Sequence, residues 1–159
     1  MNVMSNELDR GGDGMPYWRL YYHIVWATQG RAPLIKLEME DAVYRIIGHK
    51  CGDEGGLAYA VNGIEDHVHV VAAVPTTIAL ADFVKGLKGS SSRFIHTEYE
   101  VPFAWQVGYG IFTISERNLP TAIRYVQRQK EHHQAGTLIS RLERFTSEND
   151  GPRPVLAAG

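Results

Sequence analysis

The chain has 159 residues, of which 44% are hydrophobic and 21% are charged, and its formal net charge at pH 7 is −2. A chain of this length fits one domain with a sizeable core, and its apolar runs are too short to span a bilayer. The single cysteine, Cys51, excludes a disulfide framework within the chain and is typical of a reducing cytoplasm. Because Lys and Arg are not in excess, any nucleic-acid contact must come from local clusters.

Composition divides the chain into three segments. Residues 1–15 are polar and glycine-rich without the apolar stretch of a signal peptide, so we expect a disordered leader. Residues 16–134 carry the regular hydrophobic patterns and form the predicted domain. Residues 135–159 form a polar tail in which we expect at most one short helix.

In the first half of the chain, the spacing of apolar residues predicts strands and one helix. An aromatic and β-branched run at 17–28 is typical of a strand, and a helical stripe at 37–51 follows it. Residues 56–64 and 65–74 are predicted as a second and a third strand. An Asn-Gly step near the end of the second strand is a strong hairpin signal.

Predicted helices and strands continue in the second half of the chain. Apolar residues at helical spacing predict a helix over 77–95, a strand over 109–115 and a last helix over 118–133, where Pro120 is tolerated in the first turn. The order predicts an α+β fold with a ferredoxin-like antiparallel sheet and two crossover helices on one face. The C-terminal helix is additional, and we expect the second sheet face to be open for function.

Two histidines stand one residue apart in the third predicted strand. Side chains alternate along a strand, so His67 and His69 share one face, while Val68 and Val70 belong to the apolar face that packs on the helices. Cα atoms two residues apart lie roughly 7 Å from each other, so both imidazoles can converge on one metal ion. Two half-exposed histidines without a metal remain an alternative, because two ligands do not make a site.

The last predicted helix offers further polar groups. Tyr125, Gln129 and His132 follow one another at i, i+4 and i+7, on a stripe beside the buried one. This spacing puts a nucleophilic hydroxyl next to an amide oxygen that can bind a hard cation. Taken alone, Tyr125 is more typical of a packing residue, and His132 of an exposed histidine near a helix C-terminus.

Five segments together resemble a known family: YYHIVWAT, DHVHVVAAVP, LADFVKGLKGSSSRFI, WQVGYGIFTIS and IRYVQRQKEHH. Their order and spacing over about 17–133 are similar to those of the IS200-like (Y1) transposases of the HUH endonuclease superfamily, which include the REP-associated tyrosine transposases. The resemblance implies an enzyme that nicks single-stranded DNA and transfers strands through a 5′-phosphotyrosine. It also implies a homodimer whose two sheets join.

The resemblance implies a role for each polar residue of the site. Tyr125 would be the nucleophile, and His67, His69 and Gln129 would bind a divalent metal, Mg²⁺ or Mn²⁺. The implied partner is single-stranded DNA with hairpin ends, in the cytoplasm and at the nucleoid when DNA is bound. His132 is a candidate general base, and the sequence leaves open whether Tyr125 serves its own chain or a partner subunit.

Candidate phosphate contacts share one side of the second predicted helix: Lys85, Lys88 and Ser92, with Arg93 beside them. An exposed, solvated helix face explains these residues equally well. Trp105 and Tyr109 are candidates for stacking on bases, although core packing is the more usual role of such residues.

Three other functions are alternatives to the transposase that the resemblance implies. A histidine-triad nucleotide hydrolase would need a third histidine at position 71, which is Val71. A closed structural metal site would need four strong ligands, and the sequence offers two histidines and an amide. The main alternative is a non-catalytic or domesticated module that binds single-stranded nucleic acid on the same fold, although the intact Tyr125 and Gln129 favour the enzyme.

Overall fold

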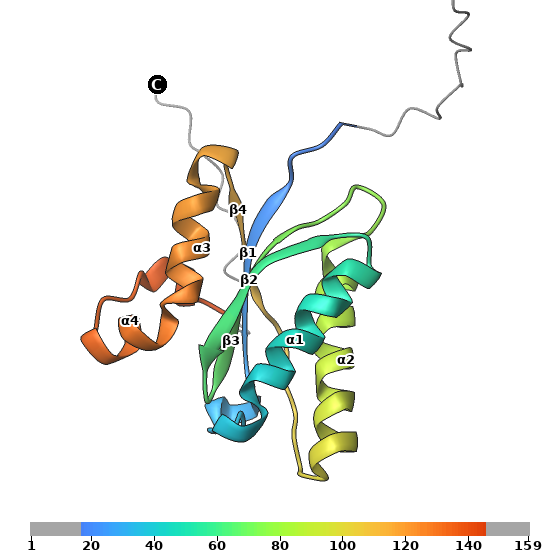
Figure 1. The fold of residues 1–159 in the computed structure, drawn as a ribbon, viewed down its shortest axis with the longest axis vertical. Helices are drawn as coiled ribbons and strands as arrows, with labels where there is room; N and C mark the ends of the chain where they lie inside the picture. The colour runs from blue at the N-terminus through green and yellow to red at the C-terminus, as the bar shows by residue number, and fades with distance from the viewer. Residues whose placement is uncertain (1–16, 146–159) are drawn as a thin grey trace, which may run out of the picture.

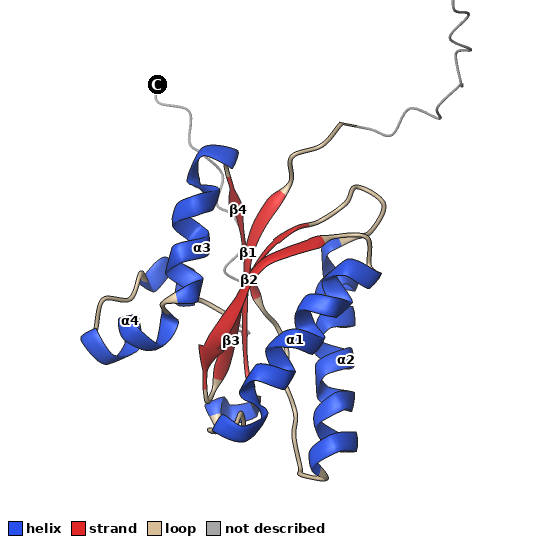
Figure 2. Cartoon of the chain, viewed as in Figure 1, coloured by secondary structure: helices blue, strands red, loops and turns tan. Residues whose placement is uncertain are grey.

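The computed structural model describes residues 17–145, which form one four-stranded sheet with helices on both faces (Figure 1, Figure 2). The elements are β1 (Tyr21–Ala27), η1 (Gln29–Arg31), α1 (Leu37–Asp53), β2 (Leu57–Ile64), β3 (His67–Ala73), α2 (Leu80–Tyr99), β4 (Gly110–Ile114), η2 (Glu116–Asn118), α3 (Leu119–Gln127), α4 (Gln129–Ala135) and η3 (Ser140–Glu143). None of the helices within 17–145 has both the length and the hydropathy that crossing a membrane requires.

The sheet has the strand order β2-β3-β1-β4, and all neighbouring strands are antiparallel. The two crossover helices, α1 and α2, lie side by side on one face (Figure 1). This arrangement confirms the predicted α+β, ferredoxin-like fold. The leader and most of the predicted tail, residues 1–15 and 146–159, lie outside the described residues.

The main core lies between the sheet and these two helices. Ile24 and Trp26 of β1 and Val68 and Val70 of β3 point into it and are fully buried. The helices contribute Val43, Ile47, Phe83, Val84 and Leu87. Complete burial of a side chain of this kind stabilises the fold by roughly 1.5–3 kcal/mol, so the clean alternation of β3 is itself a strong determinant of its orientation.

The second face of the sheet is covered, and the expectation of an open face is wrong. The segments α3, α4 and η3 lie over it (Figure 1), and Tyr125 and Val126 of α3 pack against Val71. As a result, His67 and His69 are 0% exposed. The apolar stripe of the last helix predicts that it packs somewhere, but its periodicity does not say against which surface.

The last predicted helix is two helices. The α3 helix ends at Gln127 and α4 begins at Gln129, because Arg128 between them has φ −105° and ψ 23° instead of helical angles. Figure 1 shows α4 leaving α3 at a clear angle. The amide of Arg128 still donates to the carbonyl of Arg124, at 3.1 Å, so the chain bends without losing this hydrogen bond. Neither proline nor glycine marks the bend in the sequence.

The hairpin between β2 and β3 turns three residues later than the Asn-Gly step predicts. Asn62 and Gly63 lie within β2, and the turn consists of Glu65 and Asp66. A Cβ atom on Gly63 would lie 2.1 Å from the carbonyl oxygen of His67. The glycine is therefore needed for the close approach of the two strands and not for a turn.

We expect Gly63→Ala to lower the free energy of unfolding by about 1–3 kcal/mol, because the added methyl group must push β2 away from β3. Urea denaturation measures this change. The matched control is Gly89→Ala in α2, where an added Cβ meets no atom within 4 Å and the gain in helix propensity should stabilise the protein by up to about 1 kcal/mol. Equal destabilisation by both substitutions would contradict the account.

Candidate active site

The two histidines of β3 are each held by a second polar side chain. Nδ1 of His67 donates to the carboxylate of Asp66 at 2.5 Å, and Nδ1 of His69 shares a hydrogen bond with Nε2 of His23 at 2.8 Å. Both imidazoles therefore turn their Nε2 atoms away from these partners. Such support fixes the orientation of a histidine ring and, for His67, the tautomer that leaves Nε2 free to bind a metal.

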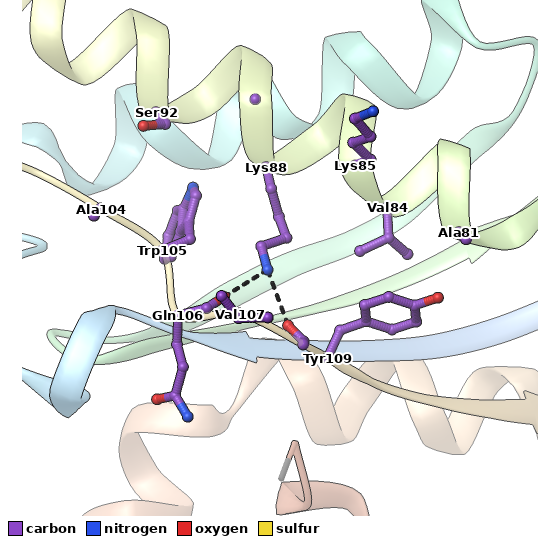
Figure 3. A pocket seen from close by; sticks show the side chains of 12 residues that line it. Ala81, Val84, Lys85, Lys88, Ser92, Ala104, Trp105, Gln106, Val107 and Tyr109 are labelled. Atoms are coloured by element: carbon purple, nitrogen blue, oxygen red, sulfur yellow. Dashed lines mark hydrogen bonds between the residues drawn. The ribbon is translucent and has the colours of Figure 1, made fainter. Parts of the chain in front are cut away.

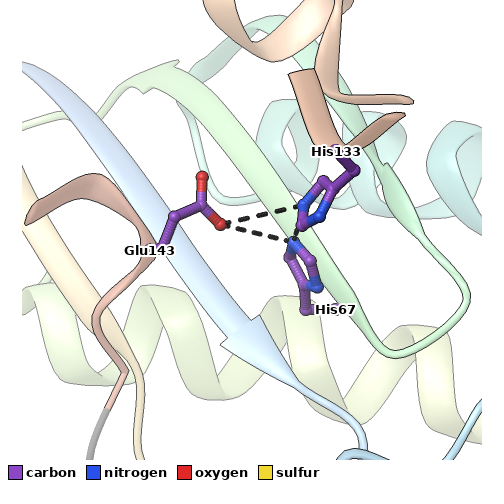
Figure 4. A group of neighbouring side chains, drawn as sticks. All are labelled: His67, His133 and Glu143. Atoms are coloured by element: carbon purple, nitrogen blue, oxygen red, sulfur yellow. Dashed lines mark hydrogen bonds and ion pairs between the residues drawn. The ribbon is translucent and has the colours of Figure 1, made fainter. Parts of the chain in front are cut away.

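The free nitrogens converge on the carboxylate of Glu143, the last residue of η3. Its Oε2 lies 3.2 Å from Nε2 of His69 and 3.5 Å from Nε2 of His67. His133 of α4 joins them, with its Nε2 3.1 Å from Nε2 of His67 and 4.0 Å from Oε2 of Glu143 (Figure 4). The ligand atoms of His67, His133 and Glu143 all lie within 4.8 Å of one another, as in a metal site.

The electrostatic state of this cluster suits a cation. Burial, with a smaller contribution from His69, lowers the pKa of His23 to about 3, and burial also lowers the pKa of His69. Burial acts to raise the pKa of Glu143, but its hydrogen bonds with His67 and His69 outweigh this and hold that pKa well below its usual range. The site thus presents the neutral imidazole of His69 beside an ionised carboxylate, which are the forms that bind metals.

Tyr125 lies beside the histidines of its own chain. Its hydroxyl donates to Oε1 of Glu143 at 2.5 Å and accepts from the backbone amide of Ile139 at 3.1 Å. Its ring stands edge-on to His69, with centroids 6.3 Å apart. Burial and the bond to Glu143 raise the pKa of Tyr125 to about 12, so the hydroxyl is protonated near neutral pH.

Gln129 is fully buried, and neither its amide nitrogen nor its amide oxygen has a hydrogen-bond partner within the described part of the chain. Its side chain lies near the hydroxyl of Tyr125. A buried polar group without a partner costs about 1–3 kcal/mol. An amide oxygen is a good ligand for a hard cation, so this orphaned group and the neighbouring imidazoles fit a divalent ion.

His132 contacts the ring of Tyr125 and not its hydroxyl. The two rings stack with centroids 4.8 Å apart and planes 27° apart, and Nδ1 of His132 pairs with Oγ1 of Thr137 at 2.9 Å. The acceptor on the hydroxyl is instead Glu143. The sequence analysis does not predict Glu143, because no local pattern marks this residue. It names His132 instead of His133, because His132 falls on the same helical stripe as Tyr125.

The predicted DNA contacts lie on α2, across the sheet from the histidines (Figure 1). A cavity of about 510 Å³ between α2 and the segment before β4 is lined by Lys85, Lys88, Ser92, Trp105 and Tyr109, among others (Figure 3), and Arg93 lines a neighbouring hollow with Lys85. The ammonium of Lys88 donates to the carbonyls of Gln106 and Gly108, at 2.7 and 2.9 Å. Trp105 donates to Ser91 and packs against the core.

The fold and the site define a class of protein: a ferredoxin-like sheet with a histidine pair on a central strand and a tyrosine lying over it. The family model described as "Transposase IS200 like" matches residues 16–129. The chain therefore belongs to the IS200-like transposase family, whose members are DNA-cleaving tyrosine transposases.

Relatives within the family align with this chain over most of their length. The chain is 28% identical to the ISDra2 transposase TnpA of Deinococcus radiodurans over 127 residues, which cover 76% of this chain and 90% of the relative. It is 25% identical to the transposase for insertion sequence element IS200 of Salmonella typhimurium over 130 residues, 77% of this chain and 85% of the relative.

Two solved structures share the fold. A crystal structure of a Deinococcus radiodurans protein assigned as a transposase gives a TM-score of 0.59 at 26% identity, over 74% of this chain and 97% of that one. A REP-associated tyrosine transposase bound to a REP hairpin gives a TM-score of 0.55 at 11% identity, over 80% of this chain and 76% of that one, which is a likeness of fold.

His133 and Glu143 lie beyond the last residue that the family model matches, 129.

Asn62 ties the end of α3 to the sheet. Its Nδ2 donates to the carbonyl of Gln127 at 2.8 Å, one residue before the bend. We expect Asn62→Ala to lower the free energy of unfolding by about 0.5–1.5 kcal/mol and to speed amide hydrogen exchange in α4. The control is Asn118→Ala, because Asn118 precedes α3 without a side-chain capping bond and should change stability by less than about 0.5 kcal/mol. Unchanged exchange in α4 would show that this bond does not position it.

Proposed function

We propose that this transposase nicks single-stranded DNA and transfers strands through a 5′-phosphotyrosine on Tyr125, with a divalent metal at the histidine pair. The observation that carries the proposal is that one carboxylate, Glu143, touches both the hydroxyl of Tyr125 and Nε2 of His69. A scissile phosphate beside Glu143 would meet the nucleophile and the metal site together. Both belong to one chain in this arrangement.

His67, His69 and Gln129 would hold the ion, Mg²⁺ or Mn²⁺. When bound, the ion would polarise the scissile phosphate and offset the negative charge that develops on it. Asp66 and His23 keep the two imidazoles turned toward the ion. The buried, unpartnered amide of Gln129 supports its part in the set.

Tyr125 supplies the chemistry that distinguishes strand transfer from hydrolysis. Its oxygen forms a bond to phosphorus as the bond from phosphorus to the 3′ oxygen breaks, and the proton that the hydroxyl of Tyr125 gives up balances the one that the leaving oxygen gains to become a 3′-OH. The tyrosine proton starts in the hydrogen bond to Oε1 of Glu143. Because the phosphotyrosine conserves the energy of the phosphodiester, a different 3′-OH can reverse the step and join new ends.

The proposed partner is single-stranded DNA with hairpin ends, as the fold shared with a REP hairpin-bound transposase supports. Lys85, Ser92 and Arg93 are the proposed phosphate contacts, while the ammonium of Lys88 is engaged by two carbonyls. A homodimer is also proposed, because within the described residues β2 and β4 are edge strands along which two sheets can join. The proposed location is the cytoplasm, at the nucleoid when DNA is bound.

We expect the wild-type protein to form a denaturant-resistant adduct with labelled single-stranded DNA that carries candidate hairpin ends, in the presence of Mn²⁺. Tyr125→Phe should reduce this adduct by more than about 1,000-fold, because the attacking oxygen is lost. The control is Tyr99→Phe at the end of α2, which removes a hydroxyl on the other side of the sheet and should leave the adduct unchanged. Specific binding by wild type and Tyr125→Phe without any adduct would favour the non-catalytic binding module.

We expect Asp66→Asn to weaken Mn²⁺ binding by about 10–100-fold, because an amide supports the ring of His67 less firmly than the carboxylate does. Calorimetric titration of the protein with Mn²⁺, without DNA, measures the affinity. Asp82→Asn, at an exposed position in the first turn of α2, is the control and should bind as the wild type does. An unchanged affinity in Asp66→Asn would argue against His67 as a ligand.

A further inference from the structure

We propose that Glu143 and His133 are additional ligands of the metal, so that the segment after the family-matched region completes the site within the same chain. This inference rests on the proposed metal-dependent function and adds to its ligand set. The ion would then be held by three imidazoles and one carboxylate, together with the amide of Gln129. The consequence is that the protein binds its metal before DNA arrives.

The spacing of the ligand atoms supports the proposal. Around an ion with bonds of about 2.0–2.2 Å, neighbouring ligand atoms lie about 2.8–3.6 Å apart in octahedral or tetrahedral geometry. Oε2 of Glu143 lies 3.2 Å from Nε2 of His69 and 3.5 Å from Nε2 of His67. Nε2 of His133 lies 3.1 Å from Nε2 of His67. Each of these three distances fits two neighbouring atoms on one ion, while Nε2 of His133 and Oε2 of Glu143, 4.0 Å apart, would lie on opposite sides of it.

Glu143 is the one residue of the proposed ligand set with a negatively charged side chain. His67, His69 and His133 would bind the ion as neutral imidazoles, and Gln129 would bind it as a neutral amide. A divalent ion among neutral ligands in a buried place would keep its full charge, which is costly away from water. One carboxylate halves that charge, and the scissile phosphate would supply the remainder when DNA binds.

The segment that carries Glu143 is firmly anchored. Phe145 packs on Val25 and Ala27, next to the histidine face, and the guanidinium of Arg31 lies 4.8 Å above its ring. The backbone runs close against β4, since a Cβ atom on Gly110 would lie 1.9 Å from the carbonyl oxygen of Arg144. Phe145 also stacks on the ring of His67, with centroids 6.2 Å apart, so Glu143 is held over the site by contacts of its neighbours with β1, β4 and His67.

The ligand set also determines which ion is preferred. Imidazole nitrogens favour Mn²⁺ and other transition ions, whereas Mg²⁺ prefers oxygen ligands and water. Three imidazoles should therefore bind Mn²⁺ more tightly than Mg²⁺ in the absence of DNA. A set of two imidazoles and one amide would discriminate less.

The test is titration of the full chain with Mn²⁺ and with Mg²⁺, without DNA, by calorimetry. We expect Glu143→Gln and His133→Asn each to raise the Kd for Mn²⁺ by at least tenfold. Gly110→Ala should raise this Kd as well, because it displaces the segment that carries Glu143 without removing any ligand side chain. The control is Glu131→Gln, an exposed residue paired with Arg128, which should change the Kd by less than about twofold. Circular dichroism and thermal melting in EDTA show whether each variant is folded.

The outcomes separate this inference from the proposed function. Wild-type affinity for Mn²⁺ in a folded Glu143→Gln variant overturns the inference. If that variant also formed the DNA adduct faster than the wild type, Glu143 would be a plug in the place of the phosphate and not a ligand. Loss of Mn²⁺ binding in His67→Gln, with binding retained in Glu143→Gln, would leave the proposed metal function standing and overturn the inference alone. Absence of Mn²⁺ binding by the wild type without DNA would also overturn it, while the adduct assay would still test the nicking function.

Discussion

The antiparallel pairing of β1 with β3 is the constraint on which the rest of the molecule depends. It runs from Tyr21 opposite Ala73 to Ala27 opposite His67, and it places His23 diagonally beside His69 on one face. On the other face the same register buries Val68 and Val70 of β3. A slip of one residue would exchange the two faces, putting imidazoles into the apolar core. Fold and site therefore depend on the same register.

A covered histidine face requires that its polar groups find partners. Asp66 and His23 support the two imidazoles, and the carboxylate of Glu143 accepts the hydroxyl of Tyr125. The amide of Gln129 and Nδ1 of His23 are buried without a hydrogen bond among the described residues. A buried amide without a partner beside these imidazoles indicates a site prepared for a further occupant, in agreement with a family of DNA-cleaving transposases.

The bend at Arg128 divides the site between two helices. Tyr125 belongs to α3, which packs on the sheet through Val126, whereas Gln129 and His133 belong to α4. The nucleophile and these polar groups can thus be positioned by separate contacts, with Asn62 holding the end of α3 and Lys130 pairing with Glu40 of α1. A continuous helix would have tied both to a single axis.

The sequence by itself determined the order of strands and helices along the chain and the shared face of His67 and His69. These features follow from periods of two and of 3.6 residues, which local sequence records. Tertiary structure alone decided that the histidine face is covered and that Glu143 meets His69 across 74 positions of sequence. It also decided that Gly63 serves a close approach and not a turn. Contacts of this kind depend on packing between distant segments, and no local pattern encodes which surface a helix or a tail will find.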